Sequence, residues 1–145
     1  MPYLLDVNVL VALFDQAHVH HSAAHAWFPR VKALGWRTCP ITENGVLRIL
    51  SHPAYPNIPL PMSELAGRLE EFKMVTGTHA FWSDNYSFSE WLSVSALPVG
   101  SAQSTDAYLL ELCQRNQGIL ATFDQRIRPS LIGATVTSVL EFIPI

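Results

Sequence analysis

Residues 3–8 read Tyr3-Leu4-Leu5-Asp6-Val7-Asn8, an apolar run that is interrupted by an acidic residue. A short, continuous apolar run is typical of a strand buried on both faces, so we expect a first strand over residues 3–7. A carboxylate next to such a strand is costly to bury alone, and it usually has a cation, a hydrogen-bonding partner or a metal ion beside it. Asp6 is therefore the first candidate for a functional residue.

Three more acidic residues lie at the start or the end of expected elements. Glu43 and Asp106 each follow a threonine that can cap a helix, and Asp124 ends the apolar run of residues 119–123. Carboxylate oxygens are the ligands that Mg²⁺ and Mn²⁺ prefer. Together with Asp6, these positions predict one convergent site for metal-assisted hydrolysis of a phosphodiester. Taken singly, each acid is explained equally well as a helix cap, a first-turn residue or a turn residue.

Apolar patterns and turn residues predict strands and helices that alternate along the chain. The expected strands cover residues 3–7, 36–39, 80–82, 119–123 and 135–139. The expected helices cover residues 9–14, 20–34, 43–50, 64–76, 88–92 and 106–117. This alternation predicts an α/β fold, with a central, mostly parallel sheet flanked by helices on both faces. Ligands of such sheets bind at the carboxyl ends of the strands, where Asp6 and Asp124 are expected.

A few residues are expected to shape these elements. Thr42 can cap the helix that carries the second candidate acid, and Gly118 is expected to stop the helix that carries the third. Pro29 falls inside the second helix and either kinks or splits it. Gly45 weakens its helix and is expected to permit close packing there. Four prolines make residues 52–61 an expected extended loop.

Length and composition bound the class of protein. The chain of 145 residues fits one domain, placed at residues 1–145, and its 49% of apolar residues indicates a globular fold. Only 14% of the residues are charged, which is consistent with an apolar surface covered by a partner. The net charge of −3 excludes a protein that coats DNA by bulk basicity. Without the four candidate acids, 9 basic and 8 acidic residues leave +1, which is compatible with nucleic acid.

The cysteines and the first residues of the chain bear on its location. Cys39 and Cys113 form no CxxC pair and no zinc-binding spacing, so we interpret both as reduced thiols of the core. The segment 1–6 has no basic start, and an acid interrupts its apolar run. We therefore expect neither a signal peptide nor a membrane span, and a cytoplasmic protein.

Four segments together resemble the PIN-domain nucleases, and within them the VapC-type toxin ribonucleases of bacterial toxin–antitoxin pairs. They contain the motifs Leu4-Leu5-Asp6-Val7-Asn8, Thr42-Glu43, Thr105-Asp106-Ala107 and Leu120-Ala121-Thr122-Phe123-Asp124. The histidine-rich start of the second helix and the proline-rich loop are also similar to one large VapC subgroup. The resemblance covers essentially the whole chain.

The resemblance implies a metal-dependent endoribonuclease that uses Mg²⁺, with Mn²⁺ as a substitute. Asn8 and Thr122 occupy positions that would support the acids from behind, although Asn8 could equally cap a helix and Thr122 could be a plain strand residue. Family members often carry a basic residue right after the last acid, whereas here Gln125 precedes Arg126. That departure puts one phosphate contact in doubt. The acids that the family pattern assigns to the metal site are Asp6, Glu43, Asp106 and Asp124.

The resemblance also implies partners. The expected substrate is structured RNA, such as a loop of tRNA or rRNA whose unstacked bases are accessible. A cognate antitoxin protein is expected to block the site by laying a helix in an apolar groove between helices of the first half of the chain. A homodimer is expected, and no membrane partner.

Other functions fit the same sequence less well. A PIN-like fold that has lost its activity would be a binding module for RNA or protein, but decay of that kind normally deletes one of the acids. A phosphatase of the haloacid dehalogenase type needs a second aspartate where Asn8 stands. The histidines invite a zinc site, but no thiol or carboxylate completes it, and the start of an amphipathic helix explains them better. These histidines are His18, His20, His21 and His25.

Overall fold

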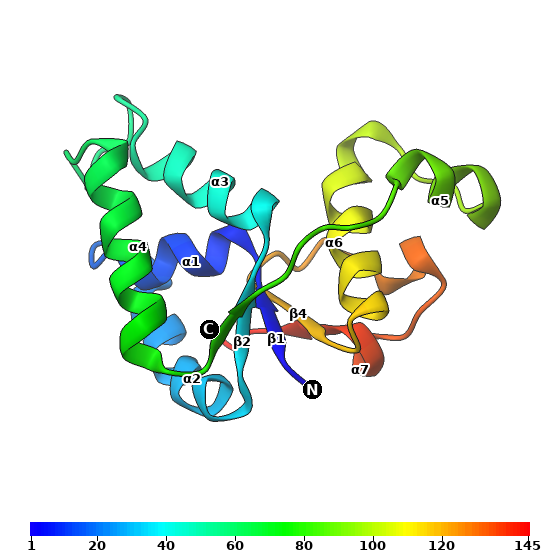
Figure 1. Ribbon diagram of the computed structural model, residues 1–145, viewed down its shortest axis with the longest axis horizontal. Coiled ribbons are helices and arrows are strands. Elements are labelled where there is room, and N and C mark those ends of the chain that lie inside the picture. Colours follow the sequence, from blue (N-terminus) through cyan, green and yellow to red (C-terminus); the bar gives the residue numbers. More distant parts are fainter.

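Five parallel strands form one sheet at the centre of the protein, in the order β3-β2-β1-β4-β5 (Figure 1). The computed structural model describes all of residues 1–145. The strands are β1 (Tyr3–Leu5), β2 (Trp36–Thr38), β3 (His79–Phe81), β4 (Ile119–Thr122) and β5 (Leu140–Phe142). The helices are α1 (Val7–Phe14), α2 (His21–Leu34), α3 (Pro40–Leu50), α4 (Met62–Thr76), α5 (Phe88–Ser95), α6 (Ser104–Arg115) and α7 (Val136–Val139). Two short 3₁₀ turns, Ser101–Gln103 and Pro129–Ile132, complete the elements.

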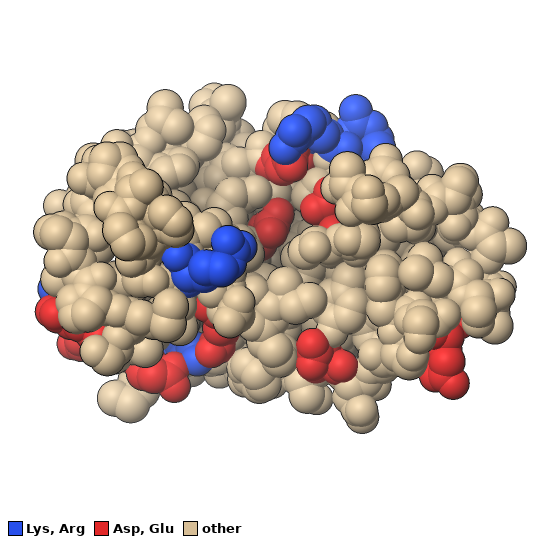
Figure 2. Space-filling model, turned by 90° about the horizontal axis from the view of Figure 1, so that it is seen from above, with Lys and Arg blue, Asp and Glu red and all other residues tan.

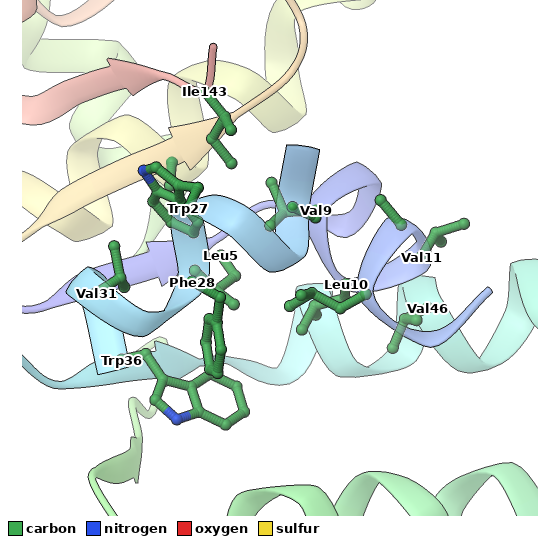
Figure 3. Packing of buried hydrophobic residues seen from close by; sticks show 14 of the residues in the cluster. Leu5, Val9, Leu10, Val11, Trp27, Phe28, Val31, Trp36, Val46 and Ile143 are labelled. Atoms are coloured by element: carbon green, nitrogen blue, oxygen red, sulfur yellow. The ribbon is translucent and has the colours of Figure 1, made fainter. Parts of the chain in front are cut away.

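The sheet separates two hydrophobic cores. Helices α1 to α4 lie on one side of it and α5 to α7 on the other (Figure 1). Alternate residues of β1 face opposite sides, because Leu5 packs in the core under α1 and α2 while Leu4 packs in the core under α6. Figure 3 shows the first of these cores, in which Leu5 lies among Val9, Trp27 and Phe28. The expected α/β fold, with helices on both faces of the sheet, is confirmed.

Helices α1 and α3 touch at a glycine. A Cβ on Gly45 would meet Cγ2 of Val7 at 2.6 Å, a distance that Cβ atoms do not tolerate. Val7 directly follows Asp6, so the absence of a side chain at Gly45 lets the middle of α3 pack beside the start of α1. The close packing expected at Gly45 is confirmed, and it sets the spacing between the two elements that carry Asp6 and Glu43.

The last expected strand is wrong in position. Residues 136–139 form the one-turn helix α7, and the strand β5 follows it at Leu140. The β-branched residues of this segment favour a strand, but hydroxyl groups close a turn instead. Thr135 Oγ1 donates to Ser138 Oγ at 3.2 Å, and Ser138 Oγ donates to the Thr135 carbonyl at 2.8 Å.

Three expected helix boundaries are also wrong. Helix α3 begins one turn earlier than expected, with Pro40 as its first residue, and Thr42 Oγ1 accepts a hydrogen bond from the Cys39 amide at 2.9 Å. Helix α1 begins at Val7 and is capped by Asp6, so Asn8 lies inside the helix and does not cap it. Gly118 is not the left-handed stop of α6. That conformation belongs to Gln117, and Gly118 instead leaves room for the Trp82 ring, which a Cβ would meet at 2.3 Å.

Other local expectations have mixed outcomes. Helix α2 runs through Pro29 without a break. The loop 52–61 is not simply extended, because it includes a turn in which the Tyr55 amide donates to the His52 carbonyl at 2.9 Å. Both cysteines are free and buried, as expected. No helix of the structure is long and apolar enough to cross a bilayer.

The contact between α1 and α3 leads to a test on stability. Gly45→Ala should lower the free energy of unfolding by about 1–3 kcal/mol, because the new methyl group overpacks against Val7. Chemical denaturation measures the change. Gly67→Ala in α4 is the matched control, because nothing lies within 4 Å of its Cβ position. The control should gain up to about 1 kcal/mol of helix propensity. Equal effects of the two substitutions would contradict the packing argument.

Candidate metal centre

Asp6 lies at the carboxyl end of β1, where the strand passes into α1. Its Oδ1 accepts a hydrogen bond from the Val7 amide at 2.7 Å and so caps the helix. Its Oδ2 accepts hydrogen bonds from Thr122 Oγ1 at 2.8 Å and from Asn8 Nδ2 at 3.2 Å. Burial nevertheless raises the pKa of Asp6, and the charge of Asp124 raises it further. The hydrogen bonds thus hold Asp6 in a fixed orientation, while its burial disfavours the charged form.

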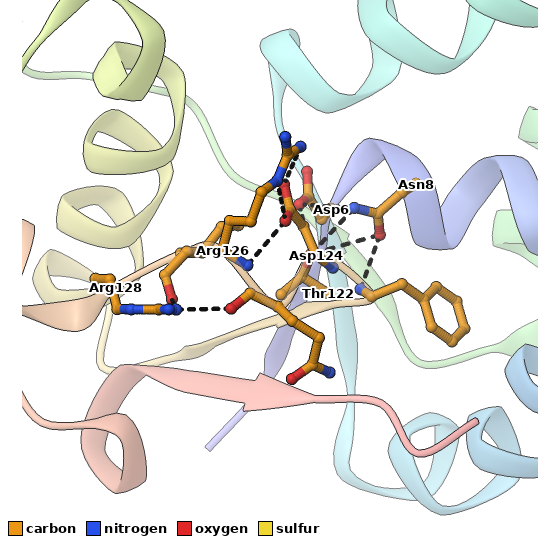
Figure 4. Close-up of polar contacts among 9 residues, drawn as sticks. Asp6, Asn8, Thr122, Asp124, Arg126 and Arg128 are labelled. Carbon is orange, nitrogen blue, oxygen red and sulfur yellow. Dashed lines mark hydrogen bonds and ion pairs between the residues drawn. The ribbon is translucent and has the colours of Figure 1, made fainter.

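Thr122 and Asn8 connect Asp6 to Asp124 (Figure 4). The Thr122 side chain is fully buried at the end of β4, and its Oγ1 accepts a hydrogen bond from the Asp124 amide at 3.0 Å. Asn8 Nδ2 donates to Thr122 Oγ1 at 3.0 Å, and Asn8 Oδ1 accepts from the Phe123 amide at 3.0 Å. The two residues therefore fix the turn after β4 relative to the start of α1, and with it the position of both carboxylates.

Asp106 joins the same group from helix α6. It lies in the first turn of that helix and is partly buried. Burial raises the pKa of Asp106 to about 6, with further contributions from the charges of Asp6 and Asp124, and Arg126 offsets part of this effect. The structure therefore brings Asp6, Asp106 and Asp124 within reach of one another's charge, although they come from three separate elements.

Asp124 already has a cationic partner. The Arg126 guanidinium donates from Nε to Oδ1 at 3.0 Å and from Nη2 to Oδ2 at 3.1 Å, so it engages both carboxylate oxygens (Figure 4). These hydrogen bonds hold the pKa of Asp124 below its usual range. The Arg126 side chain is 90% exposed, so this contact is one that water and salt screen strongly.

Glu43 makes its contacts elsewhere. It lies in the first turn of α3, where Lys73 Nζ approaches its Oε2 at 2.6 Å and the Thr38 hydroxyl donates to the same oxygen. The charges that shift the pKa of Asp106 are those of Asp6, Asp124 and Arg126. The structure therefore groups the three aspartates and holds Glu43 in a separate set of contacts, with Lys73 and Thr38.

The chemistry of the donor set fits a hard divalent cation. The three grouped aspartates offer only oxygen ligands, and their mutual repulsion is the kind that a cation relieves. In the present conformation no three His, Cys, Asp or Glu side chains converge closely enough to hold one ion together. Side-chain movements would therefore be needed before one ion contacts them all, and the Arg126 guanidinium would compete with that ion for the oxygens of Asp124.

The histidines have structural contacts. The His21 ring nitrogen Nδ1 bonds to the Ala12 carbonyl at 2.8 Å, and His25 Nε2 bonds to the Leu13 carbonyl at 3.0 Å. Both rings thereby bind the last carbonyls of α1. This arrangement agrees with the structural interpretation of these residues rather than with a zinc site.

Sequence reasoning missed three residues near Glu43: Thr38, Lys73 and His79. Thr38 is fully buried at the end of β2, and its Oγ1 lies 2.8 Å from His79 Nε2. The position of Thr38 at the carboxyl end of a strand was a usable signal. Nothing in the local sequence points to Lys73 or His79, because each reaches Glu43 or Thr38 from a distant part of the chain.

The face above the carboxyl ends of the strands is hollowed. Figure 2 shows acidic atoms inside this hollow and basic side chains at its edge. The mix of signs is what a site for a phosphate-bearing substrate and a cation requires, because the cation offsets the acids and basic groups attract the phosphate.

Comparison with known proteins places the chain in a family. The family model described as PIN domain matches residues 3–129 of this chain. The chain is 41% identical over 139 residues to Ribonuclease VapC44 of Mycobacterium tuberculosis, an alignment covering 93% of this chain and 95% of that protein. It is 39% identical over 121 residues to Ribonuclease VapC38 of the same organism, covering 83% and 84%. For Ribonuclease VapC39 the identity is 36% over 146 residues, covering 94% and 98%.

The matched segment runs from β1 to the turn after β4 and so contains all four candidate acids. The alignments with the VapC proteins extend over most of both chains. The chain therefore belongs to the PIN-domain family, and within it to the group of proteins named VapC.

Proposed function

We propose that the protein, taken as one PIN domain over residues 1–145, is a metal-dependent endoribonuclease and the toxin of a toxin–antitoxin pair. One observation carries the proposal. Asp6, Asp106 and Asp124 lie near one another at the carboxyl edge of the sheet, where burial and, after it, the charge of neighbouring aspartates raise the pKa of Asp6 and of Asp106. Carboxylates crowded in this way are a strained arrangement without a cation, and such strain is typical of a functional site. The names of the VapC relatives supply the class of substrate.

The proposed roles follow from the contacts. Asp6, Asp106 and Asp124 would hold Mg²⁺ or Mn²⁺, and Glu43 would support the ion through water or orient the attacking water. A bound divalent ion would lower the pKa of the attacking water and stabilise charge on the phosphate. Thr122 and Asn8 keep Asp6 and Asp124 in register through their hydrogen bonds. Water would be the nucleophile and the ribose 3′-oxygen the leaving group, so the products would carry a 5′-phosphate and a 3′-hydroxyl, and the ribose 2′-OH would take no part.

The proposed substrate is a loop of structured RNA, in tRNA or rRNA. The site is an open hollow rather than a deep slot, so it suits a strand whose bases are already unstacked (Figure 2). Arg126 and Arg128 are exposed beside Asp124, and they are the proposed cationic contacts for the phosphates of the RNA. Release of Arg126 from Asp124 would free its guanidinium for such a contact.

The proposed protein partners are an antitoxin and a second copy of the chain. A hollow of about 410 Å³ lies between α1, α4 and the loop 52–61, and Phe14, Leu60 and Leu65 contribute to its lining. Apolar residues at the junction of helices suit the helix of an antitoxin. Arg68 at the edge offers a cation for an acid on that helix.

Substitution of Asp6 tests the nuclease. Asp6→Asn keeps one oxygen that can cap α1 but removes the charge and one of the two acceptor oxygens, so metal-dependent cleavage of RNA should fall by about 10²-fold or more. The measurement is cleavage of total cellular RNA by purified protein with Mg²⁺ or Mn²⁺, against EDTA.

The matched control is Glu90→Gln, which removes an exposed first-turn acid of α5 far from the site and should cleave like the wild type. Full activity of Asp6→Asn would refute the metal role of Asp6. If folded, antitoxin-free wild-type protein cut no RNA with either metal, the binding-module hypothesis would replace the nuclease.

The raised pKa of Asp106 predicts how the metal-free protein depends on pH. The folded-state pKa of about 6 lies above the value of 3.8 for a free aspartate, so the native state binds more protons between these pH values. Stability should therefore fall as pH rises from about 4 to about 6. In EDTA at pH 8, Asp106→Asn should be more stable than the wild type by about 1 kcal/mol after allowance for solvent screening.

That gain should vanish at pH 4, where the wild-type carboxyl is itself protonated in the native state. Urea denaturation at both pH values measures it, with Glu90→Gln as the control. Added Mg²⁺ should raise the stability of the wild type and leave Asp106→Asn nearly unchanged. A variant that is less stable than the wild type at pH 8 would contradict the repulsion argument.

A further inference from the structure

Lys73 links helix α4 to the candidate acid of α3. It lies in the last turn of α4, and its Nζ is 2.6 Å from Glu43 Oε2 and 2.6 Å from Glu70 Oε2. The side chains of Lys73 and Glu43 are only 13% and 21% exposed, whereas that of Glu70 is 67% exposed. The contact with Glu43 is therefore the more sheltered of the two, and a sheltered charge pair is less screened by water and salt.

A second donor reaches the same oxygen of Glu43. The Thr38 hydroxyl donates its only proton to Glu43 Oε2, so its oxygen accepts from His79 Nε2, which lies 2.8 Å away. Burial, followed by repulsion from Lys73, lowers the pKa of His79 to about 4, so this ring is neutral at pH 7. Lys73 is therefore the one cation that contacts Glu43.

Both donors meet at Oε2, and no protein group donates a hydrogen bond to Oε1. A carboxylate held by one oxygen between a lysine and a threonine cannot rotate freely. Its second oxygen stays available for water or a ligand. Thr38 belongs to the sheet, because it is the last residue of β2, and Lys73 belongs to α4. The two donors therefore fix Glu43 relative to both elements. The arrangement has the form of a clamp that fixes one acid for use by another part of the site.

We propose that Lys73 is a positioning residue of the nuclease, and that its ammonium group, with Thr38, orients Glu43 so that Oε1 faces the attacking water. This inference rests on the proposed function, because it assigns Lys73 a part in the same reaction. Helix α4 thereby contributes to the site, although it supplies none of the four acids. Lys73 acts through Glu43 and touches neither the substrate nor the three grouped aspartates.

The test is the rate of RNA cleavage at saturating Mn²⁺ by Lys73→Met, Lys73→Gln and Lys73→Arg. Lys73→Met should lower kcat by about 10²-fold with little change in KM, because a displaced Glu43 weakens the chemical step rather than RNA binding. Lys73→Gln should behave similarly, and it provides a folded variant if the methionine variant does not fold. Lys73→Arg keeps the charge and should recover a large part of kcat.

Two further variants separate positioning from other roles. Lys32→Met removes the other lysine of the chain, an exposed residue in the last turn of α2 that pairs with no acid, so its kcat should match the wild type. Lys73→Met is also made in the Glu43→Gln background and measured under single-turnover conditions. If Lys73 acts only through Glu43, the second substitution should change the rate less than twofold there.

The outcomes are distinct. Wild-type kcat in folded Lys73→Met or Lys73→Gln would overturn the positioning role and leave the nuclease standing. The same large loss of rate in the Glu43→Gln background would also overturn it, because Lys73 would then act directly. Absence of cleavage by the wild type with Mn²⁺ or Mg²⁺ would overturn the proposed function, and this inference with it.

Discussion

Three carboxylates lie near one another in this protein, and they repel each other unless other groups offset their charge. Asp6, Asp106 and Asp124 come from β1, α6 and the turn after β4, and parallel strands bring these points to one edge of the sheet. Nearby groups offset the repulsion in part. The Val7 amide, a buried threonine and an asparagine donate hydrogen bonds to Asp6, and the Arg126 guanidinium neutralises Asp124. No side chain donates a hydrogen bond to Asp106, and burial, followed by the charges of Asp6 and Asp124, raises its pKa to about 6. A divalent cation is the natural completion of this arrangement.

The scaffold keeps the acids in place from two directions. On one side, the core under α1 and α2 fixes β1, and the contact of Gly45 with Val7 sets α3 against α1. On the other side, the core under α6 presses that helix onto β4. Because protein cores are close-packed, shifts at either side are costly and the relative positions of the acids are well defined. Glu43 differs from the aspartates in that its orientation depends on side chains, Thr38 and Lys73, more than on a strand end.

The sequence predicts the fold and identifies the four candidate acids better than it predicts the local structure and the side-chain contacts around them. Alternating apolar runs and helical patterns predict the parallel sheet, because they reflect burial, and burial is what the fold maximises. The segment 135–139 shows the limit of that reasoning. Its β-branched residues favour a strand, yet local hydroxyl bonds make it a turn of helix. The clamp on Glu43 was beyond prediction for another reason. Lys73 is 30 positions away in sequence, and only the packing of α4 on α3 brings the two together.

The most direct test of this account is a crystal structure of the antitoxin-free protein grown with Mn²⁺, with data collected at the Mn absorption edge. The account predicts anomalous density between Asp6, Asp106 and Asp124, with the Arg126 guanidinium moved away from at least one oxygen of Asp124. Density at another place in the protein would contradict it. So would an empty site at Mn²⁺ concentrations that support cleavage of RNA.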